Sequence, residues 1–178
     1  MEDSSGLDVG DAAPEFTGPL VDPDGGTRDV PLADLYRDTP VLLSFYTMDF
    51  SPDCVGEWCA FRDLDWFASG EHVRVVGSSK SSAWLHERFI DYLGLQFPLY
   101  ADRDLDLAEK FGVKYRALKL SARSRRSCFL VDTDGVIRYK WVGTHSIDPT
   151  RDVPPVNELH RALESELDLR EPESFGMG

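Results

Sequence analysis

Blocks of apolar residues along the chain predict strands and helices that alternate. The apolar run Val41–Phe45 is typical of a buried strand, and the β-branched segment Val73–Gly77 predicts another. Apolar residues at helical spacing predict helices over Ser81–Leu93 and Pro155–Leu167, and a further helix is expected from Pro52 to about Phe67. The residues that set the spacing over Ser81–Leu93 are Trp84, Leu85, Phe89, Tyr92 and Leu93.

Shorter segments, bounded by glycine, proline and aspartate, complete the pattern. They predict flanking strands, a short helix and a hairpin at Phe16–Leu20, Arg28–Pro31, Leu105–Phe111, Cys128–Val131 and Val136–Val142. Strand–helix–strand alternation that ends in a hairpin and a helix predicts a layered α/β domain. We expect residues 1–170 to form a single domain and residues 171–178 to form a flexible tail.

Charge and composition narrow the class of protein. The chain has 178 residues and a formal net charge of −13, from 32 acidic and 19 basic residues. Binding to nucleic acid or to an anionic membrane needs clustered Lys and Arg, so both are disfavoured. The acidic surplus is dispersed along the chain and is typical of a solvated surface.

The cysteine count and the N-terminus point to the cytoplasm. Three cysteines are too few for a secreted disulfide scaffold. The first residues lack the basic start and apolar core of a signal peptide, and no apolar run reaches the length of a membrane span. We therefore expect a soluble cytoplasmic protein that binds neither nucleic acid nor membrane.

Cys54 is the clearest candidate for a chemically reactive residue. Ser51 is a favoured N-cap and Pro52 a favoured first helical residue, so Cys54 falls in the first helical turn. Backbone amides and the positive end of the helix dipole favour a thiolate there. Most free cysteines are small buried hydrophobes. The helix-start position and a second cysteine, Cys59, argue for a reactive role instead.

A metal site is the obvious alternative for a pair of cysteines. Zinc ligand pairs usually have two to four intervening residues and a second pair elsewhere in the chain. The four histidines, His72, His86, His145 and His160, are scattered and show no ligand spacing. Because nucleotide-binding glycine loops are also missing, we expect neither a metal nor a cofactor.

The window from Thr47 to Cys54 resembles the active-site motif of the peroxiredoxin family (AhpC/TSA type). That motif is Pro-x-x-x-Thr/Ser-x-x-Cys, and Ser51 and Cys54 match it, whereas Thr47 stands where the family has proline. The spacing of Cys54 and Cys59 is similar to that of the peroxiredoxin Q (bacterioferritin comigratory protein) branch. Segments that resemble the rest of the family follow in family order: Val9–Phe16, Phe97–Leu99, Phe111–Val113 and Arg126–Asp132.

The resemblance implies a fold and a reaction. The fold would be a thioredoxin fold with peroxiredoxin-type N-terminal additions and a central mixed sheet flanked by helices. The reaction would be thiol-dependent reduction of hydrogen peroxide or alkyl hydroperoxides through a sulfenic acid at Cys54. A thioredoxin- or glutaredoxin-type protein would supply the electrons, and the protein would be a monomer or a homodimer.

The resemblance also assigns roles to single residues. Arg126 would support the thiolate and bind the peroxide, and Glu57 would orient Arg126. Ser51 would share its hydroxyl between the helix cap and the peroxide. The family proline shields the cysteine and shapes the loop, whereas Thr47 lacks the ring and would add a hydroxyl near the sulfur. Read without the family, Arg126 is equally a solvated member of the basic patch with Arg123 and Arg125, and Glu57 a helix-surface residue.

Cys59 would resolve the sulfenic acid of Cys54 by forming an intramolecular disulfide. Residues five apart in an α-helix have Cα atoms about 8.7 Å apart, whereas a disulfide usually needs less than roughly 7 Å. The first helical turns must therefore unwind before the bond forms. The alternative is that Cys59 packs in the core and an outside thiol resolves Cys54. Cys128, inside an apolar strand, is expected to be structural.

Two other functions fit the same residues. One is a peroxide-sensing regulatory protein that uses the oxidation of Cys54 to change partners and turns over little. The other is a thioredoxin-like disulfide reductase, which the gap of four residues between Cys54 and Cys59 disfavours, since such enzymes use Cys-x-x-Cys.

Overall fold

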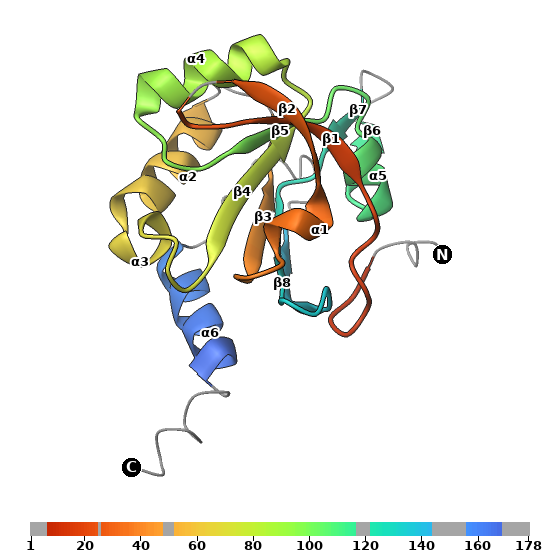
Figure 1. The fold of residues 1–178 in the computed structure, drawn as a ribbon, viewed down its shortest axis with the longest axis vertical. Coiled ribbons are helices and arrows are strands. Elements are labelled where there is room, and N and C mark those ends of the chain that lie inside the picture. The colour runs from red at the N-terminus through yellow and green to blue at the C-terminus, as the bar shows by residue number, and fades with distance from the viewer. Residues whose placement is uncertain (1–6, 25, 48–51, 117–121, 144–155, 169–178) are drawn as a thin grey trace.

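The computed structural model describes residues 7–24, 26–47, 52–116, 122–143 and 156–168, which form a central sheet with helices on both faces (Figure 1). The strands are β1 (Thr17–Val21), β2 (Thr27–Pro31), β3 (Val41–Phe45), β4 (Arg74–Ser79), β5 (Leu99–Ala101), β6 (Lys114–Arg116), β7 (Ala122–Ser124), β8 (Ser127–Val131) and β9 (Ile137–Val142). The helices are α1 (Leu32–Leu35), α2 (Pro52–Asp63), α3 (Asp65–Ala68), α4 (Ala83–Leu93), α5 (Asp106–Lys110) and α6 (Val156–Asp168).

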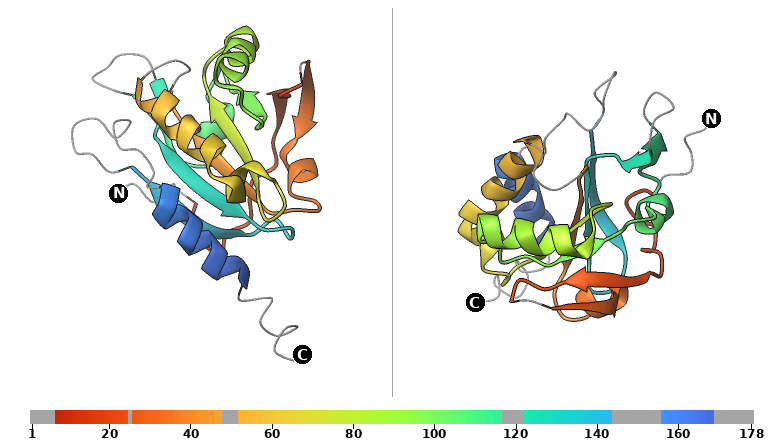
Figure 2. Two further views of the ribbon diagram at one scale, coloured as in Figure 1. Left: turned by 90° about the vertical axis from the view of Figure 1, so that its left-hand side faces the viewer. Right: turned by 90° about the horizontal axis from the view of Figure 1, so that it is seen from above.

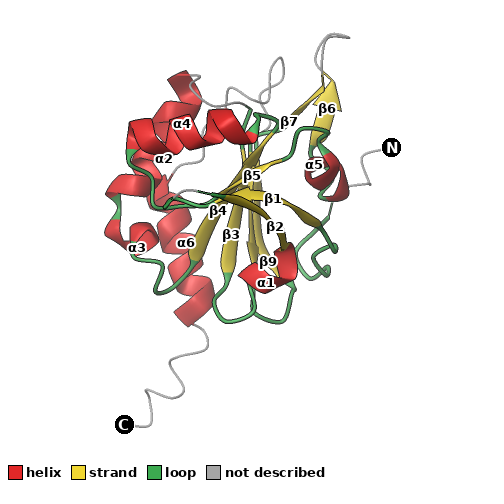
Figure 3. Ribbon diagram, turned by 45° about the horizontal axis from the view of Figure 1, so that its top comes forward, coloured by secondary structure: helices red, strands yellow, loops and turns green. Residues whose placement is uncertain are grey.

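The large sheet is mixed and has the strand order β2-β1-β5-β4-β3-β8-β9 (Figure 3). Strands β3, β4 and β5 run parallel, while β1, β2, β8 and β9 join by antiparallel pairing. The four strands β4-β3-β8-β9, with α2 between β3 and β4 and α6 after β9, form the thioredoxin arrangement. Strands β1 and β2 are the N-terminal addition, so the expected fold is confirmed.

Each face of the sheet has its own core, because side chains alternate along every strand. One core joins α2, α4 and α6 to the face that carries Leu42, and includes Phe61 and Leu163. The other joins α1 and α5 to the face that carries Leu43 and Phe129. The two side views show α2 and α6 lying next to each other along one side of the sheet (Figure 2).

Two details of the helices differ from the sequence-based expectation. The helix expected from Pro52 to about Phe67 ends at Asp63, since Leu64 is extended and caps the separate helix α3. In α4, Trp84 and Tyr92 were expected on the apolar face but are 62% and 72% exposed. The position of each residue around the helix explains this. The buried residues recur at intervals of three and four, and Trp84 and Tyr92 fall on the opposite side. The buried residues are His86, Phe89, Ile90 and Leu93.

Most other expected elements are present with shifts of one or two residues at their ends. Strand β3 has the predicted bounds. Ser82 caps α4 by accepting a hydrogen bond from the Leu85 amide, and Gly94 ends it in the left-handed conformation. The elements α1, β5, β6 and β7 were not predicted, and each has only three or four residues.

Of the helices in the described ranges, none has the length and apolar character that crossing a bilayer requires.

A close contact fixes α2 against the sheet. Gly77 of β4 has no side chain, and a Cβ atom there would lie 2.6 Å from the indole of Trp58 and 2.6 Å from Leu99. Trp58 is completely buried and packs edge-on against Tyr46, which follows β3. The missing side chain at Gly77 therefore lets α2 approach the sheet closely at the residue next to Glu57.

Candidate active site

The site lies where β3 ends and α2 begins. Cys54 is in the first turn of α2 and is buried. Arg126 precedes β8, and because β8 runs antiparallel to β3, with Phe45 opposite Ser127, Arg126 lies beside the end of β3. Two segments 72 residues apart in sequence therefore meet at one sulfur atom. Ser51 lies outside the described residues.

One nitrogen of the Arg126 guanidinium connects the two sides of the site. Nη1 donates to Cys54 Sγ at 3.1 Å and to Glu57 Oε1 at 2.7 Å. Both side chains of the Arg126–Glu57 ion pair are withdrawn from solvent. The surface interpretations of Arg126 and Glu57 are therefore wrong. Arg125 instead lies over the ring of Tyr115 and is half-buried.

Burial sets the electrostatics of the pair. It raises the pKa of Glu57, and the charge of Arg126 together with hydrogen bonds from Arg126 and Ser44 offsets part of that rise. Burial lowers the pKa of Arg126, but the charges of Glu57 and Cys54 reverse this and leave the pKa above its ordinary value. Arg126 is thus a fixed cation beside sulfur. Removing one member of such a pair typically costs about 3–5 kcal/mol.

Ser44 was not singled out from the sequence, yet it contacts the same carboxylate. Its hydroxyl donates to Glu57 Oε2 at 2.9 Å and lies 3.5 Å from Cys128 Sγ. The sequence does contain a signal for this residue, because Ser44 is the one polar residue in the apolar run Val41–Phe45. Cys128 is completely buried, as expected for a structural residue, and burial raises its pKa far above the ordinary value.

Thr47 also lies at the end of β3, two residues after Phe45. Its side chain is 6% exposed, and its Oγ1 has no hydrogen-bond partner among the described residues. A buried hydroxyl without a partner is costly, by about 1–3 kcal/mol in mutational data. Such a group is a candidate for binding a ligand.

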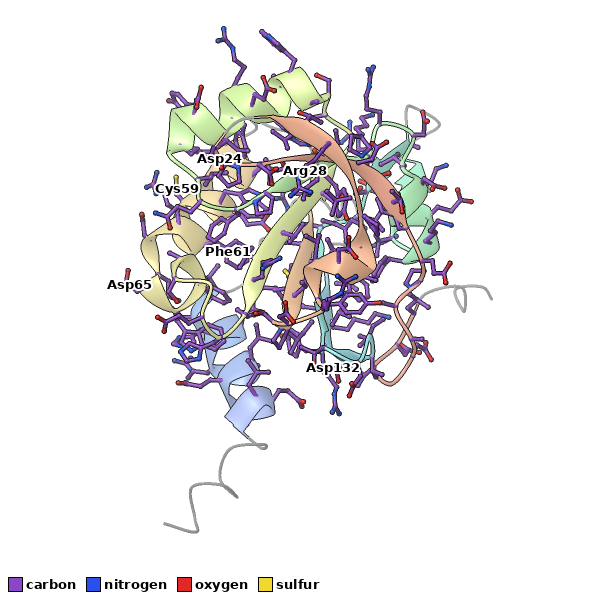
Figure 4. The ribbon with its side chains drawn as sticks, viewed as in Figure 1. Asp24, Arg28, Cys59, Phe61, Asp65 and Asp132 are labelled. Carbon is purple, nitrogen blue, oxygen red and sulfur yellow. The ribbon has the colours of Figure 1, made fainter. Side chains whose placement is uncertain are left out.

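Cys59 lies on the same continuous helix as Cys54. It is half-buried, toward the outer edge of the molecule, whereas Phe61 packs in the core (Figure 4). Both cysteines are free thiols in this structure. The described residues contain no cluster of three or more His, Cys, Asp or Glu side chains suited to a metal ion.

The fold and the buried Cys–Arg–Glu arrangement define a thioredoxin-fold protein with a cysteine centre. The sequence profile of the AhpC/TSA family matches residues 9–140. A bcp peroxiredoxin of Coxiella burnetii is 38% identical over 138 residues, which cover 76% of this chain and 88% of the relative. Peroxiredoxin Q of Oryza sativa subsp. japonica is 33% identical over 130 residues, covering 73% of this chain and 57% of the relative.

Two solved structures share the fold of this chain. The peroxidoxin BcpB of Mycobacterium tuberculosis superimposes with a TM-score of 0.71 at 28% identity, covering 92% of this chain and 98% of the other. A peroxiredoxin Q of Xylella fastidiosa gives a TM-score of 0.73 at 24% identity, covering 89% of this chain and 96% of the other. The chain belongs to the AhpC/TSA family. It is a peroxiredoxin, related to the bcp and peroxiredoxin Q proteins, and a thiol-dependent peroxidase.

Proposed function

We propose that Cys54 is the residue that reacts with peroxide. Its thiolate sulfur attacks one peroxide oxygen, the O–O bond breaks, and the departing oxygen takes up a proton and leaves as water or an alcohol. Cys54 becomes a sulfenic acid, the reversible first product of thiol oxidation. The observation that carries this proposal is the hydrogen bond from Arg126 Nη1 to Cys54 Sγ at 3.1 Å.

Arg126 serves both the resting sulfur and the reacting peroxide. Its charge is held beside Cys54 by Glu57, so it is in place before the substrate arrives. As negative charge moves onto the leaving oxygen, a nearby guanidinium stabilises it without rearrangement. The hydroxyl groups of Thr47 and, by the family motif, Ser51 help to orient the peroxide. The buried hydroxyl of Thr47, without a partner among the described residues, supports this part of the proposal.

Cys59 then resolves the sulfenic acid. Its thiolate attacks the sulfur of Cys54, the S–O bond breaks as the disulfide forms, and the departing hydroxide takes up a proton and leaves as water. The two residues lie on one helix, so α2 must unwind over its first turns, and Glu57 and Trp58 leave their buried positions. Gly56, exposed and centrally placed in the segment, weakens the helix by about 1 kcal/mol relative to alanine and so favours unwinding.

A dithiol protein of the thioredoxin or glutaredoxin type returns the disulfide to two thiols. The chain works in the cytoplasm, as a monomer or a homodimer, on hydrogen peroxide or alkyl hydroperoxides. No bound cofactor or metal takes part, because the sulfur of Cys54 carries the oxidation and the reductant carries the electrons.

Cys54→Ser should abolish peroxide consumption, because serine does not form the nucleophilic thiolate. The measurement is steady-state peroxide loss with a dithiol reductant. Trapping of a sulfenic acid on the wild-type chain with a dione reagent, followed by peptide mapping, should place the oxidation on Cys54. Undiminished turnover of the variant would refute the assignment.

Arg126→Met should slow the oxidation of Cys54 by roughly hundredfold or more, which is typical for loss of an aligned charged donor at a developing charge. The rate is measured in a single turnover with hydrogen peroxide. Arg125→Met is the matched control, because Arg125 is the neighbouring arginine and lies over Tyr115. Its rate should stay at the wild-type value, and the reverse ranking of the two variants would show that the wrong arginine was assigned.

Cys59→Ser should consume one equivalent of peroxide and then stall with a thioredoxin-type reductant, because no internal disulfide forms.

Gly56→Ala should form the disulfide about fivefold more slowly, since alanine stabilises the helix by about 1 kcal/mol. The oxidation step itself should be unchanged in Gly56→Ala, whose added Cβ would meet no atom within 4 Å outside its own helix.

Peptide mapping of peroxide-treated monomers should find Cys54 bonded to Cys59. A bond between Cys54 and Cys128, or a disulfide-linked dimer as the main product, would place the resolving role elsewhere. Disulfide formation in Gly56→Ala at the wild-type rate would contradict the requirement for unwinding.

Thr47→Val should stabilise the fold and slow the reaction at the same time. Valine has nearly the same shape and removes a buried hydroxyl without a partner among the described residues, worth about 1–3 kcal/mol. Loss of a donor to the peroxide should lower the rate of Cys54 oxidation. Thermal unfolding and single-turnover kinetics measure the two effects. A more stable variant with an unchanged rate would exclude Thr47 from the site.

A further inference from the structure

Ser44 is a buried polar residue in the middle of the sheet. It lies in β3, on the face that α2 covers, and is completely buried. A buried hydroxyl is costly unless it is hydrogen-bonded. The Ser44 hydroxyl therefore needs a hydrogen-bond partner, and that partner is Glu57 of the candidate active site.

The hydrogen bonds around Ser44 have a defined direction. Ser44 Oγ lies 2.9 Å from Glu57 Oε2, and a carboxylate paired with arginine only accepts hydrogen bonds, so the single hydroxyl hydrogen of Ser44 points to Glu57. Cys128 Sγ, 3.5 Å from Ser44 Oγ, must then donate its S–H to that oxygen. Ser44 and Cys128 are directly opposite each other on antiparallel strands, so the register of the sheet maintains this contact.

The chain of contacts continues through the carboxylate. Glu57 accepts from Ser44 on Oε2 and from Arg126 on Oε1, and the same Arg126 nitrogen reaches Cys54 Sγ. Both carboxylate oxygens therefore have partners, and rotation of the carboxylate would break two bonds at once. Burial of Cys128, which raises its pKa, keeps its sulfur protonated and able to donate.

We propose that Ser44, held by the thiol of Cys128, is a positioning residue for the peroxidase reaction. It fixes the Glu57 carboxylate so that the Arg126 guanidinium is aimed at Cys54. Cys128 thus has a role as a hydrogen-bond donor behind the site and takes no part in the redox step. This inference goes beyond the proposed function and rests on it, because the rate of Cys54 oxidation is its readout.

The test compares serine-to-alanine changes on opposite faces of the sheet. Ser44→Ala should lower the single-turnover rate of Cys54 oxidation by hydrogen peroxide roughly three- to tenfold, the fold-change that corresponds to one ordinary hydrogen bond, because its effect is passed on indirectly through Arg126. Ser78→Ala is the matched control. Ser78 is equally buried in the adjacent strand β4, and its hydroxyl has no partner among the described residues. Its rate should not change.

Two further comparisons separate positioning from mere packing. Cys128→Ala should lower the rate, and Cys128→Ser, which keeps a donor, should restore it. In an Arg126→Met background, Ser44→Ala should have no further effect, because it acts only through Arg126. Circular dichroism and thermal unfolding confirm that each variant is folded, and the Cys128 pair tests the idea even if Ser44→Ala does not fold.

Several results would overturn the inference: a wild-type rate in Ser44→Ala, equal rates in Cys128→Ser and Cys128→Ala, or an undiminished effect of Ser44→Ala in the Arg126→Met background. A silent Ser44→Ala beside a slow Arg126→Met would refute only this inference. Continued turnover of Cys54→Ser would refute the proposed function itself.

Discussion

The buried ion pair between Arg126 and Glu57 is the constraint on which the rest of the site depends. Both charges are out of water, so each is tolerated only because the other is within hydrogen-bond distance. Arg126 comes from the segment before β8 and Glu57 from the second turn of α2. The pair therefore ties the start of α2 to the sheet, and Cys54 lies at the point where they meet.

The ion pair also creates a conflict within α2. The folded helix keeps Glu57 and Trp58 buried and holds Arg126 beside the sulfur, which is what the proposed reaction of Cys54 with peroxide needs. Formation of a Cys54–Cys59 disulfide needs the opposite, because the helix spacing keeps the two Cα atoms too far apart. A helix that contains Gly56 and has buried charge at Glu57 is suited to both states, since its folded form is held by tertiary contacts more than by intrinsic helix propensity.

Local signals in the sequence predicted much of this structure. The apolar run of β3, the helix start at Pro52 and the hairpin before β9 depend on neighbouring residues, and they are confirmed. The choice of Arg126 over Arg123 and Arg125 came from family resemblance, because local pattern treats three nearby arginines alike. The contact agrees with that choice, since only the register of β8 against β3 decides which arginine reaches Cys54.

Other features could not be predicted, because they depend on tertiary packing. The end of α2 at Asp63 arises where Leu64 turns extended, and no glycine or proline marks it. Helical spacing in α4 gave the right helix but the wrong face for Trp84 and Tyr92, since apolar character alone does not say which side meets the sheet. The hydrogen bond of Ser44 could not be predicted either, because its partner, the Glu57 carboxylate, comes from α2 and meets β3 only in the folded chain.

The central claim is that the buried charge of Glu57 keeps the Arg126 guanidinium in hydrogen-bond contact with Cys54 Sγ. Glu57→Gln tests it most directly, because glutamine has the same shape and still accepts a hydrogen bond while the charge is lost. The measurement is the single-turnover rate of Cys54 oxidation by hydrogen peroxide in a variant shown to be folded. The account predicts a rate at least tenfold lower, since a bond to a charged group is worth about 1.5–3 kcal/mol. A rate equal to that of the wild-type chain would contradict it.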